Sequence, residues 1–88
     1  MKMQPVKVVE VEGEGLVSLL GEQVSLFCAV YIYSGKLVGV NDTCVKLENP
    51  KIVYETGPLM DKKWKDAQDL PSPHYVSTGM IESFGVGK

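Results

Sequence analysis

Arginine is absent from this 88-residue chain, and every basic position other than the single histidine is a lysine. Acidic residues outnumber the lysines, which gives a formal net charge of −2 at neutral pH. Proteins that recognise duplex nucleic acid usually have a strongly basic surface, with arginine forks that bind phosphates and base edges. The composition therefore counts against duplex recognition.

Long apolar runs are also missing. Polar residues such as Gln4, Lys7 and Glu10 interrupt the N-terminal stretch. Elsewhere, no segment approaches the roughly eighteen consecutive apolar residues of a membrane span. We therefore expect no signal peptide, no membrane contact and a cytoplasmic location.

Few residues are suited to metal binding or nucleophilic catalysis. Cys28 and Cys44 lie in separate strand-like segments without a CxxC motif, and the single histidine, His74, is distant from both in sequence. This pattern matches neither a zinc site nor a disulfide framework, so we expect buried, reduced thiols. The carboxylates are scattered, and no Ser-His-Asp or Cys-His order is present. The sequence predicts no enzyme, no metal site and no cofactor.

Small domains have little interior in which to bury apolar side chains. A chain of this length buries only about 60 to 65% of the surface that it exposes when unfolded, so its core needs a supplement. Because neither disulfides nor a metal are predicted, we expect self-association to supply it. We treat residues 1–88 as a single domain.

Residues 24–33 are rich in β-branched and aromatic side chains, as strands are. Their even positions, such as Val24, and their odd positions, such as Phe27, are both apolar. An antiparallel strand with one solvated face should alternate apolar and polar residues, so both faces of this strand should be covered. We expect a short helix at residues 14–20 to cover one of them, with its leucines packed on the sheet.

Turn and breaker residues divide the rest of the chain. We expect strands at residues 6–11, 24–33, 36–40, 43–48, 51–55 and 74–84. Asn49-Pro50 should end one strand, because proline cannot donate to a ladder. Residues 57–73 contain three prolines and no sustained periodicity, which predicts a long loop, and residues 85–88 should be a frayed end. The pattern predicts an all-β fold: a small, strongly bent antiparallel barrel of about five strands with a short N-terminal helix.

The string YSGKLVGVNDTCVKL at residues 33–47 resembles the first signature motif of Sm-like proteins. In that motif a G-x-L, an acidic residue and an apolar strand follow one another. The preceding LVSLLGEQV at residues 16–24 is similar to the short helix and first strand of the same family. The resemblance is nearest to a divergent, phage-encoded branch. It implies an Sm-like or SH3-like barrel, a homo-oligomeric ring of about five to seven subunits, and binding of single-stranded RNA or DNA in nucleic-acid processing.

Gly35 has two interpretations. Local chemistry places a hairpin turn at Ser34-Gly35, whereas the resemblance places Gly35 at a bend inside a continuous strand. The family has its turn shortly before the G-x-L, where this chain runs from Cys28 to Tyr31 without a turn former. We favour the bend, because it helps a small barrel to close.

The resemblance implies two nucleic-acid contacts. The first is the loop at Asn41, Asp42 and Thr43, together with Lys46. The second is Thr78-Gly79, which stands where the family has an arginine-glycine pair. The family's loop also carries a base-stacking aromatic or histidine and an asparagine that this chain lacks. Any tight turn could use Asn41 and Asp42, so a purely structural role is the alternative.

A second candidate comes from the residues themselves. The run DKKWKD places Lys62, Lys63 and Lys65 around Trp64, which combines an aromatic platform with charges that bind phosphate. The alternative is a solvated loop whose tryptophan docks on the barrel.

Two functions therefore compete. One is a ring that binds single-stranded nucleic acid, with RNA preferred over DNA. The other is a structural or scaffold oligomer, for example a phage component, that binds none. The Sm-like strings and the Lys-Trp run favour the first, and the acidic composition without arginine favours the second.

Overall fold

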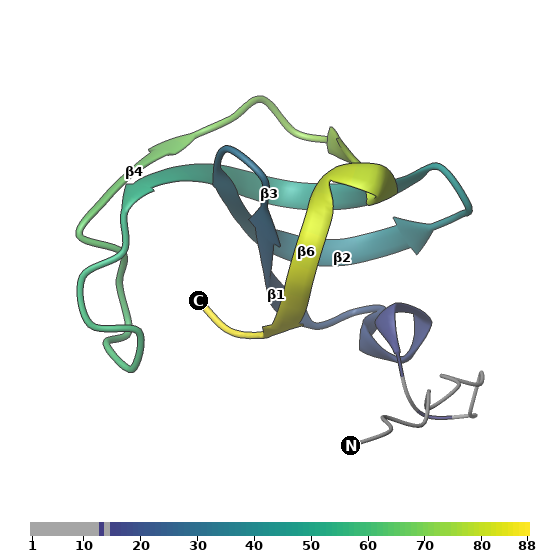
Figure 1. Cartoon of the computed structure of the whole chain (residues 1–88), viewed down its shortest axis with the longest axis horizontal. Coiled ribbons are helices and arrows are strands. Elements are labelled where there is room, and N and C mark those ends of the chain that lie inside the picture. Colours follow the sequence, from purple (N-terminus) through teal and green to yellow (C-terminus); the bar gives the residue numbers. More distant parts are fainter. Residues whose placement is uncertain (1–12, 14) are drawn as a thin grey trace, which may run out of the picture.

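A computed structural model describes residue 13 and residues 15–88 of the chain. The elements are a 3-10 helix η1 (Leu16–Leu19), the strands β1 (Gln23–Cys28), β2 (Ile32–Val40), β3 (Cys44–Glu55), β4 (Asp66–Asp69) and β5 (His74–Ser77), a 3-10 helix η2 (Thr78–Met80), and β6 (Ile81–Val86) (Figure 1). The strand predicted at residues 6–11 and the first residue of the helix predicted at 14–20 lie outside the described residues.

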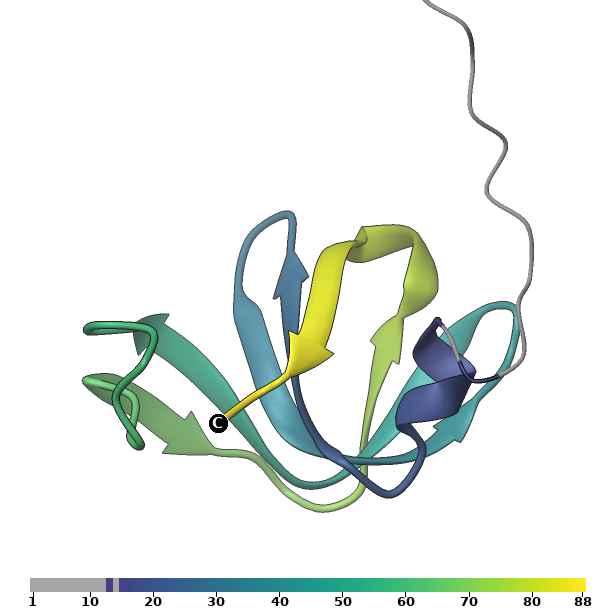
Figure 2. The same cartoon turned by 90° about the horizontal axis from the view of Figure 1, so that it is seen from below.

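The described strands form one antiparallel sheet in the order β4-β3-β2-β1-β6, and β5 also pairs with β3. β5 pairs with the first residues of β3 and β4 pairs with its last residues, so both lie along the same side of that long strand. Figure 2 shows the strong curvature of the sheet. The predicted all-β class is confirmed. Within the described residues the sheet is bent but open, so it is a barrel only in a loose sense.

The prediction of one long strand over residues 24–33 is wrong, because the chain turns between residues 28 and 32. β1 ends at Cys28, β2 begins at Ile32, and the two pair as a hairpin. Its turn is closed by a hydrogen bond of 3.1 Å from the Cys28 N–H to the Tyr31 carbonyl. The turn residues include Ala29 and Val30, neither of which is a turn former. The apolar pattern on both faces thus belongs to two strands.

Gly35 lies inside β2, as the favoured interpretation predicts. Asn49 and Pro50 do not end a strand: β3 continues through them to Glu55, so the separate strand predicted at 51–55 is its second half. The pairing of β2 with β3 shifts at this point, from Ser34 opposite Lys51 to Lys36 opposite Glu48. β3 therefore carries an extra residue opposite Gly35, and Asn49 adopts a left-handed φ of 49°. Such a bulge bends the strand without interrupting it.

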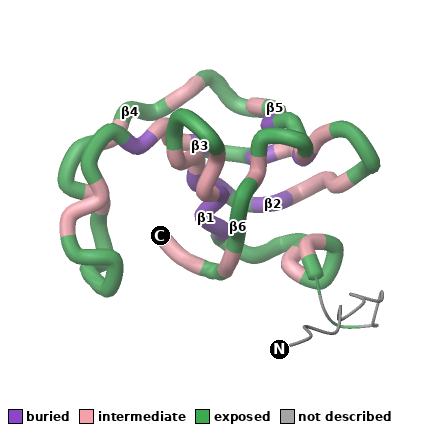
Figure 3. Tube along the Cα trace, in the orientation of Figure 1, coloured by how far each residue is buried: buried purple, intermediate pink, exposed green. Residues whose placement is uncertain are grey.

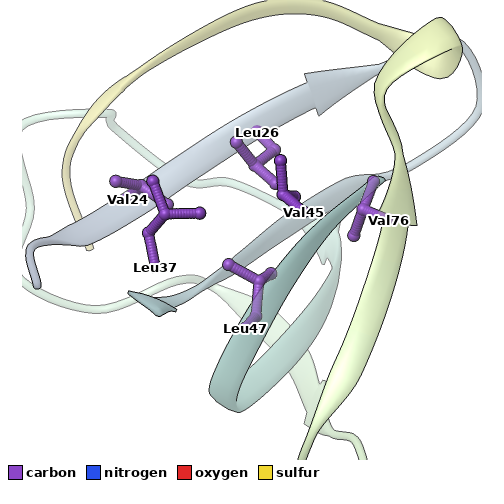
Figure 4. Packing of buried hydrophobic residues seen from close by; sticks show 6 residues of the cluster. All are labelled: Val24, Leu26, Leu37, Val45, Leu47 and Val76. Carbon is purple, nitrogen blue, oxygen red and sulfur yellow. The ribbon is translucent and has the colours of Figure 1, made fainter. Parts of the chain in front are cut away.

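The buried residues lie mainly on the central strands of the sheet (Figure 3). Six fully or almost fully buried residues from β1, β2, β3 and β5 form the core: Val24, Leu26, Leu37, Val45, Leu47 and Val76 (Figure 4). Leu16 and Leu19 of η1 pack against this cluster, as expected for the predicted helix. Leu20, which follows η1, stays 46% exposed. The 3-10 helix is a single turn that ends at Leu19, so Leu20 lies beyond it and outside the packed face.

Three further predictions need correction. Residues 57–73 are not one loop, because β4 lies within them and pairs with β3. Residues 74–84 are not one strand, because η2 separates β5 from β6. Residues 85–88 are not frayed: β6 extends to Val86, and the Gly87 N–H donates to the Gln23 carbonyl at 3.0 Å.

Between residues 15 and 88, no helix is long and apolar enough to cross a membrane.

Candidate nucleic-acid interface

The loop between β2 and β3 is organised by one side chain. Asn41 Oδ1 accepts hydrogen bonds from the backbone N–H groups of Thr43 at 2.8 Å and Cys44 at 2.9 Å, and from Thr43 Oγ1 at 3.1 Å. An asparagine that accepts such local bonds fixes a tight turn. Asn41 and Thr43 therefore have structural roles here, and the exposed Asp42 side chain is left directed at solvent.

η2 lies against this loop. Thr78 Oγ1 donates to the Asp42 carbonyl at 2.9 Å, and the Thr78 N–H donates to the Thr43 carbonyl at 2.9 Å. Gly79 follows within the same 3-10 turn. The structure thus brings together the two segments that are far apart in sequence, residues 41–43 and residues 78–79. We call this set the loop pair.

Lys46 extends the loop pair along the sheet. It is opposite Tyr75 in the β3–β5 ladder, and its Nζ lies 6.0 Å from the centre of the Tyr75 ring. Tyr75 is 57% exposed, so one tyrosine ring accessible to solvent accompanies the cation. Sequence reasoning missed Tyr75. Only the register between Lys46 and Tyr75 could have revealed it, and that register depends on a pairing across a long connection.

Lys62, Lys63, Trp64 and Lys65 form a second cluster in the β3–β4 connection. Trp64 Nε1 donates to Ser34 Oγ at 3.1 Å and to the Lys88 backbone oxygen at 3.0 Å, and Ser34 is fully buried. The Lys88 ammonium lies 4.5 Å from the centre of the Trp64 ring. Trp64 therefore anchors the connection to β2, and a cation already covers part of its ring. This geometry favours the packing alternative for Trp64.

Lys88 holds the same connection through its side chain. Its ammonium donates to the carbonyls of Pro58 and Lys63 at 3.0 Å and of Thr56 at 3.3 Å. An ammonium group has three donors, and three carbonyls with an indole face satisfy it. Sequence reasoning assigned this residue to a frayed end, because no local pattern signals a contact with residues 56–64.

A hollow of about 400 Å³ lies beside this second cluster, and its lining includes Lys51, Lys62, Lys63, Lys65 and Lys88. Lys51 forms an ion pair with Asp69, and Lys65 pairs with Glu55 at 3.3 Å. Among the described residues, Lys62 and Lys63 form no ion pair. These two lysines are the part of the cluster most open to an anion.

The two clusters are not one site. The β2–β3 loop and the β3–β4 connection project from opposite ends of the molecule in both views (Figures 1 and 2). The structure therefore joins Asn41, Asp42, Thr43, Lys46, Thr78 and Gly79 but leaves Lys62, Lys63, Trp64 and Lys65 apart from them. One bound strand could reach both clusters of a single copy only by crossing the whole molecule.

Within the described part of the chain, no group of three or more His, Cys, Asp or Glu side chains is placed to hold a metal ion. Cys28 and Cys44 are both free and half-buried. His74 stacks on Tyr33 with a distance of 5.8 Å between ring centres. That the protein is not an enzyme stays a prediction from the sequence.

No family model, no curated protein and no solved structure matches this chain.

Proposed function

We propose that this protein is a homo-oligomer that binds single-stranded nucleic acid, RNA in preference to DNA, with the loop pair as its contact surface. The observation that carries the proposal is the pair of hydrogen bonds from Thr78 to Asp42 and Thr43. They join the two segments to which the Sm-like resemblance assigns base contacts. The resemblance itself rests on residues 16–24 and 33–47.

The loop pair has the groups that single strands need. Asp42 offers carboxylate oxygens that accept hydrogen bonds from base amino groups or from ribose hydroxyls. Tyr75 offers an exposed ring on which a base can stack, and Lys46 beside it offers a charge for phosphate. Asn41 and Thr43 contribute by holding the loop in shape. A single copy has few such groups, so useful affinity requires several copies along one strand.

The sheet has open edges through which copies could join. β3 is excluded, because Ile52 pairs with Tyr33 on one side and with Gln68 on the other. The resemblance implies that the strand around Ile52 or the one around Gly79 pairs with a neighbouring subunit, and the first of these has no free edge. Among the described strands, the open edges are β6 at one end of the sheet and β4 with β5 at the other. Pairing of unlike edges between neighbours is a head-to-tail contact, which closes into a ring when the rotation allows.

We predict an oligomer in solution. The described part of each copy has two open sheet edges and exposed apolar residues such as Met60 and Val86. Closure of a ring would pair the edges and cover apolar surface. Light scattering coupled to size-exclusion chromatography should give a mass of about five to seven times that of the 9.7 kDa chain. A monomer mass at micromolar concentration would contradict the ring.

We predict that the intact oligomer binds a uridine-rich RNA and that Tyr75→Ala weakens binding by about tenfold, because a base loses its stacking partner. Fluorescence anisotropy with a labelled oligonucleotide measures this. Tyr75→Phe is the matched control, since it keeps the ring and should bind like the unchanged protein. Lys46→Met should weaken binding of all sequences alike, because phosphate contacts carry no sequence information.

The competing function, a structural or scaffold oligomer, predicts a different result in the same binding experiment. If the folded oligomer binds neither RNA nor DNA of the same composition at low salt, the nucleic-acid proposal is wrong. The structural or scaffold oligomer then takes its place, because the open edges of the sheet support assembly without any ligand.

A further inference from the structure

Four rings that belong neither to the loop pair nor to the cluster around Trp64 form a continuous row. Tyr54 and Tyr31 have ring centres 6.0 Å apart at 86°, and Tyr31 and Tyr33 are 6.5 Å apart at 73°. Tyr33 then stacks on His74 at 5.8 Å and 27°. We call these four residues the aromatic row. They come from three strands and one turn, so no single sequence pattern shows them together.

A groove of about 330 Å³ runs beside the aromatic row. The β1–β2 hairpin forms one wall with Cys28, Val30, Tyr31 and Tyr33. The other wall includes His74, Met80 and Tyr75, so the groove adjoins the surface proposed to contact RNA. Val30 is 73% exposed, and Tyr54 next to Tyr31 is about half exposed. Accessible apolar residues gathered around a groove mark a binding surface more often than an accident of folding.

The walls of the groove are fixed relative to one another. The Ala29 N–H at the hairpin tip donates to the Met80 carbonyl at 3.0 Å, which ties the hairpin to the end of η2. The Tyr54 hydroxyl donates to Gln68 Oε1 at 3.2 Å, which holds that ring against β4. A groove held in this way is pre-formed, so binding costs little ordering of the protein.

The lining of the groove is aromatic and apolar, apart from Cys28, Ser77 and the imidazole of His74. No Lys, Asp or Glu is among the described residues that line it. Burial, with a smaller contribution from Glu82, raises the pKa of the Cys28 thiol above its ordinary value, and burial likewise raises that of the Tyr33 hydroxyl. A nucleic acid needs cations along its backbone, and a charged peptide needs opposite charges, so neither matches this lining.

We propose that the aromatic row and its groove bind an uncharged, proline-rich peptide segment in the polyproline II conformation. Such a segment is pre-ordered and docks in grooves lined by aromatic rings. Its backbone carbonyls are not used in internal hydrogen bonds, so tyrosine hydroxyls can donate to them. Among the described residues, the Tyr31 and Tyr33 hydroxyls have no hydrogen-bond partner in the protein, which leaves both donors free for this role.

The test uses the intact protein and a peptide of about ten prolines with both ends blocked, which is neutral and adopts polyproline II. Chemical-shift changes in ¹H–¹⁵N spectra should be confined to the groove, at Val30, Tyr31 and Met80. Titration should give a measurable Kd, and Tyr31→Ala should raise it by about tenfold. A Gly-Ser peptide of the same length should not bind.

Phe84→Ala is the matched control. Phe84 is 43% exposed and Tyr31 is 42% exposed, but Phe84 does not line the groove. Its substitution should leave the Kd unchanged, and Tyr54→Phe, which keeps the ring, should change it far less than Tyr54→Ala. The proposal is overturned if the folded protein does not bind the proline peptide. It is also overturned if Tyr31→Ala weakens the binding of RNA and not of the peptide.

Discussion

A Gly35→Val substitution is expected to destabilise the protein by about 3 kcal/mol or more, which is enough to unfold much of a marginal small domain. A Cβ at this position would lie 3.0 Å from the Glu48 carbonyl oxygen and 3.2 Å from both Leu47 Cβ and Pro50 Cα. Two of these neighbours are backbone atoms of the β3 bulge, so they cannot move aside as a flexible side chain would. Urea denaturation followed by far-UV circular dichroism measures the loss.

Gly85 gives the matched control. It also lies in a strand, but a Cβ there would meet no atom within 4 Å. Gly35→Ala should cost about 1 to 3 kcal/mol, and Gly85→Ala should cost well under that. Equal midpoints for the two alanine variants would show that the bulge of β3 is not packed against Gly35.

The second large effect is expected from Trp64→Ala. This change removes a half-buried indole and leaves the buried Ser34 hydroxyl without the N–H that donates to it, so we expect a loss of about 2 kcal/mol or more. Far-UV circular dichroism in urea is the suitable measurement, because the variant has no tryptophan fluorescence. Trp64→Phe keeps an aromatic ring and should lose less.

This experiment also separates the two roles considered for Trp64. A packing anchor predicts a lower denaturation midpoint for Trp64→Ala, while RNA binding by the folded variant is little changed. A base-stacking platform predicts the reverse: an unchanged midpoint and weaker RNA binding at every salt concentration. The contacts with Ser34 and Lys88 lead us to expect the first result.

The fold class could be predicted from local patterns, because β-branched and aromatic residues indicate strands. The bend at Gly35 followed from the resemblance instead, since local turn chemistry indicated a hairpin at Ser34-Gly35. The hairpin at Ala29-Val30 could not be predicted, since neither residue favours a turn. There the pairing of β1 with β2 and with β6 decides the geometry, and it overrides the local preference.

The candidate site was partly predictable for a similar reason. Asn41 and Asp42 are turn residues, and their loop was found. That Thr78 lies against this loop was not predicted, because the two segments are far apart in the sequence. The aromatic row could not be found at all, because Tyr31, Tyr54 and His74 meet only through the pairing of distant strands. The number of lysines was an equally poor guide to nucleic-acid binding, because it does not show which lysines already contact a carboxylate or a carbonyl group.

The engagement of Lys88 limits how many ions a bound strand could displace. At the end of the molecule that holds Trp64, Lys88 is committed to three carbonyls, and Lys51 and Lys65 have carboxylate partners. Lys62 and Lys63 remain, and two phosphate contacts to a single strand release only about 1.4 counterions. At this lysine-rich end, the affinity for a single strand should therefore fall only slightly as the salt concentration rises, because few counterions are released on binding.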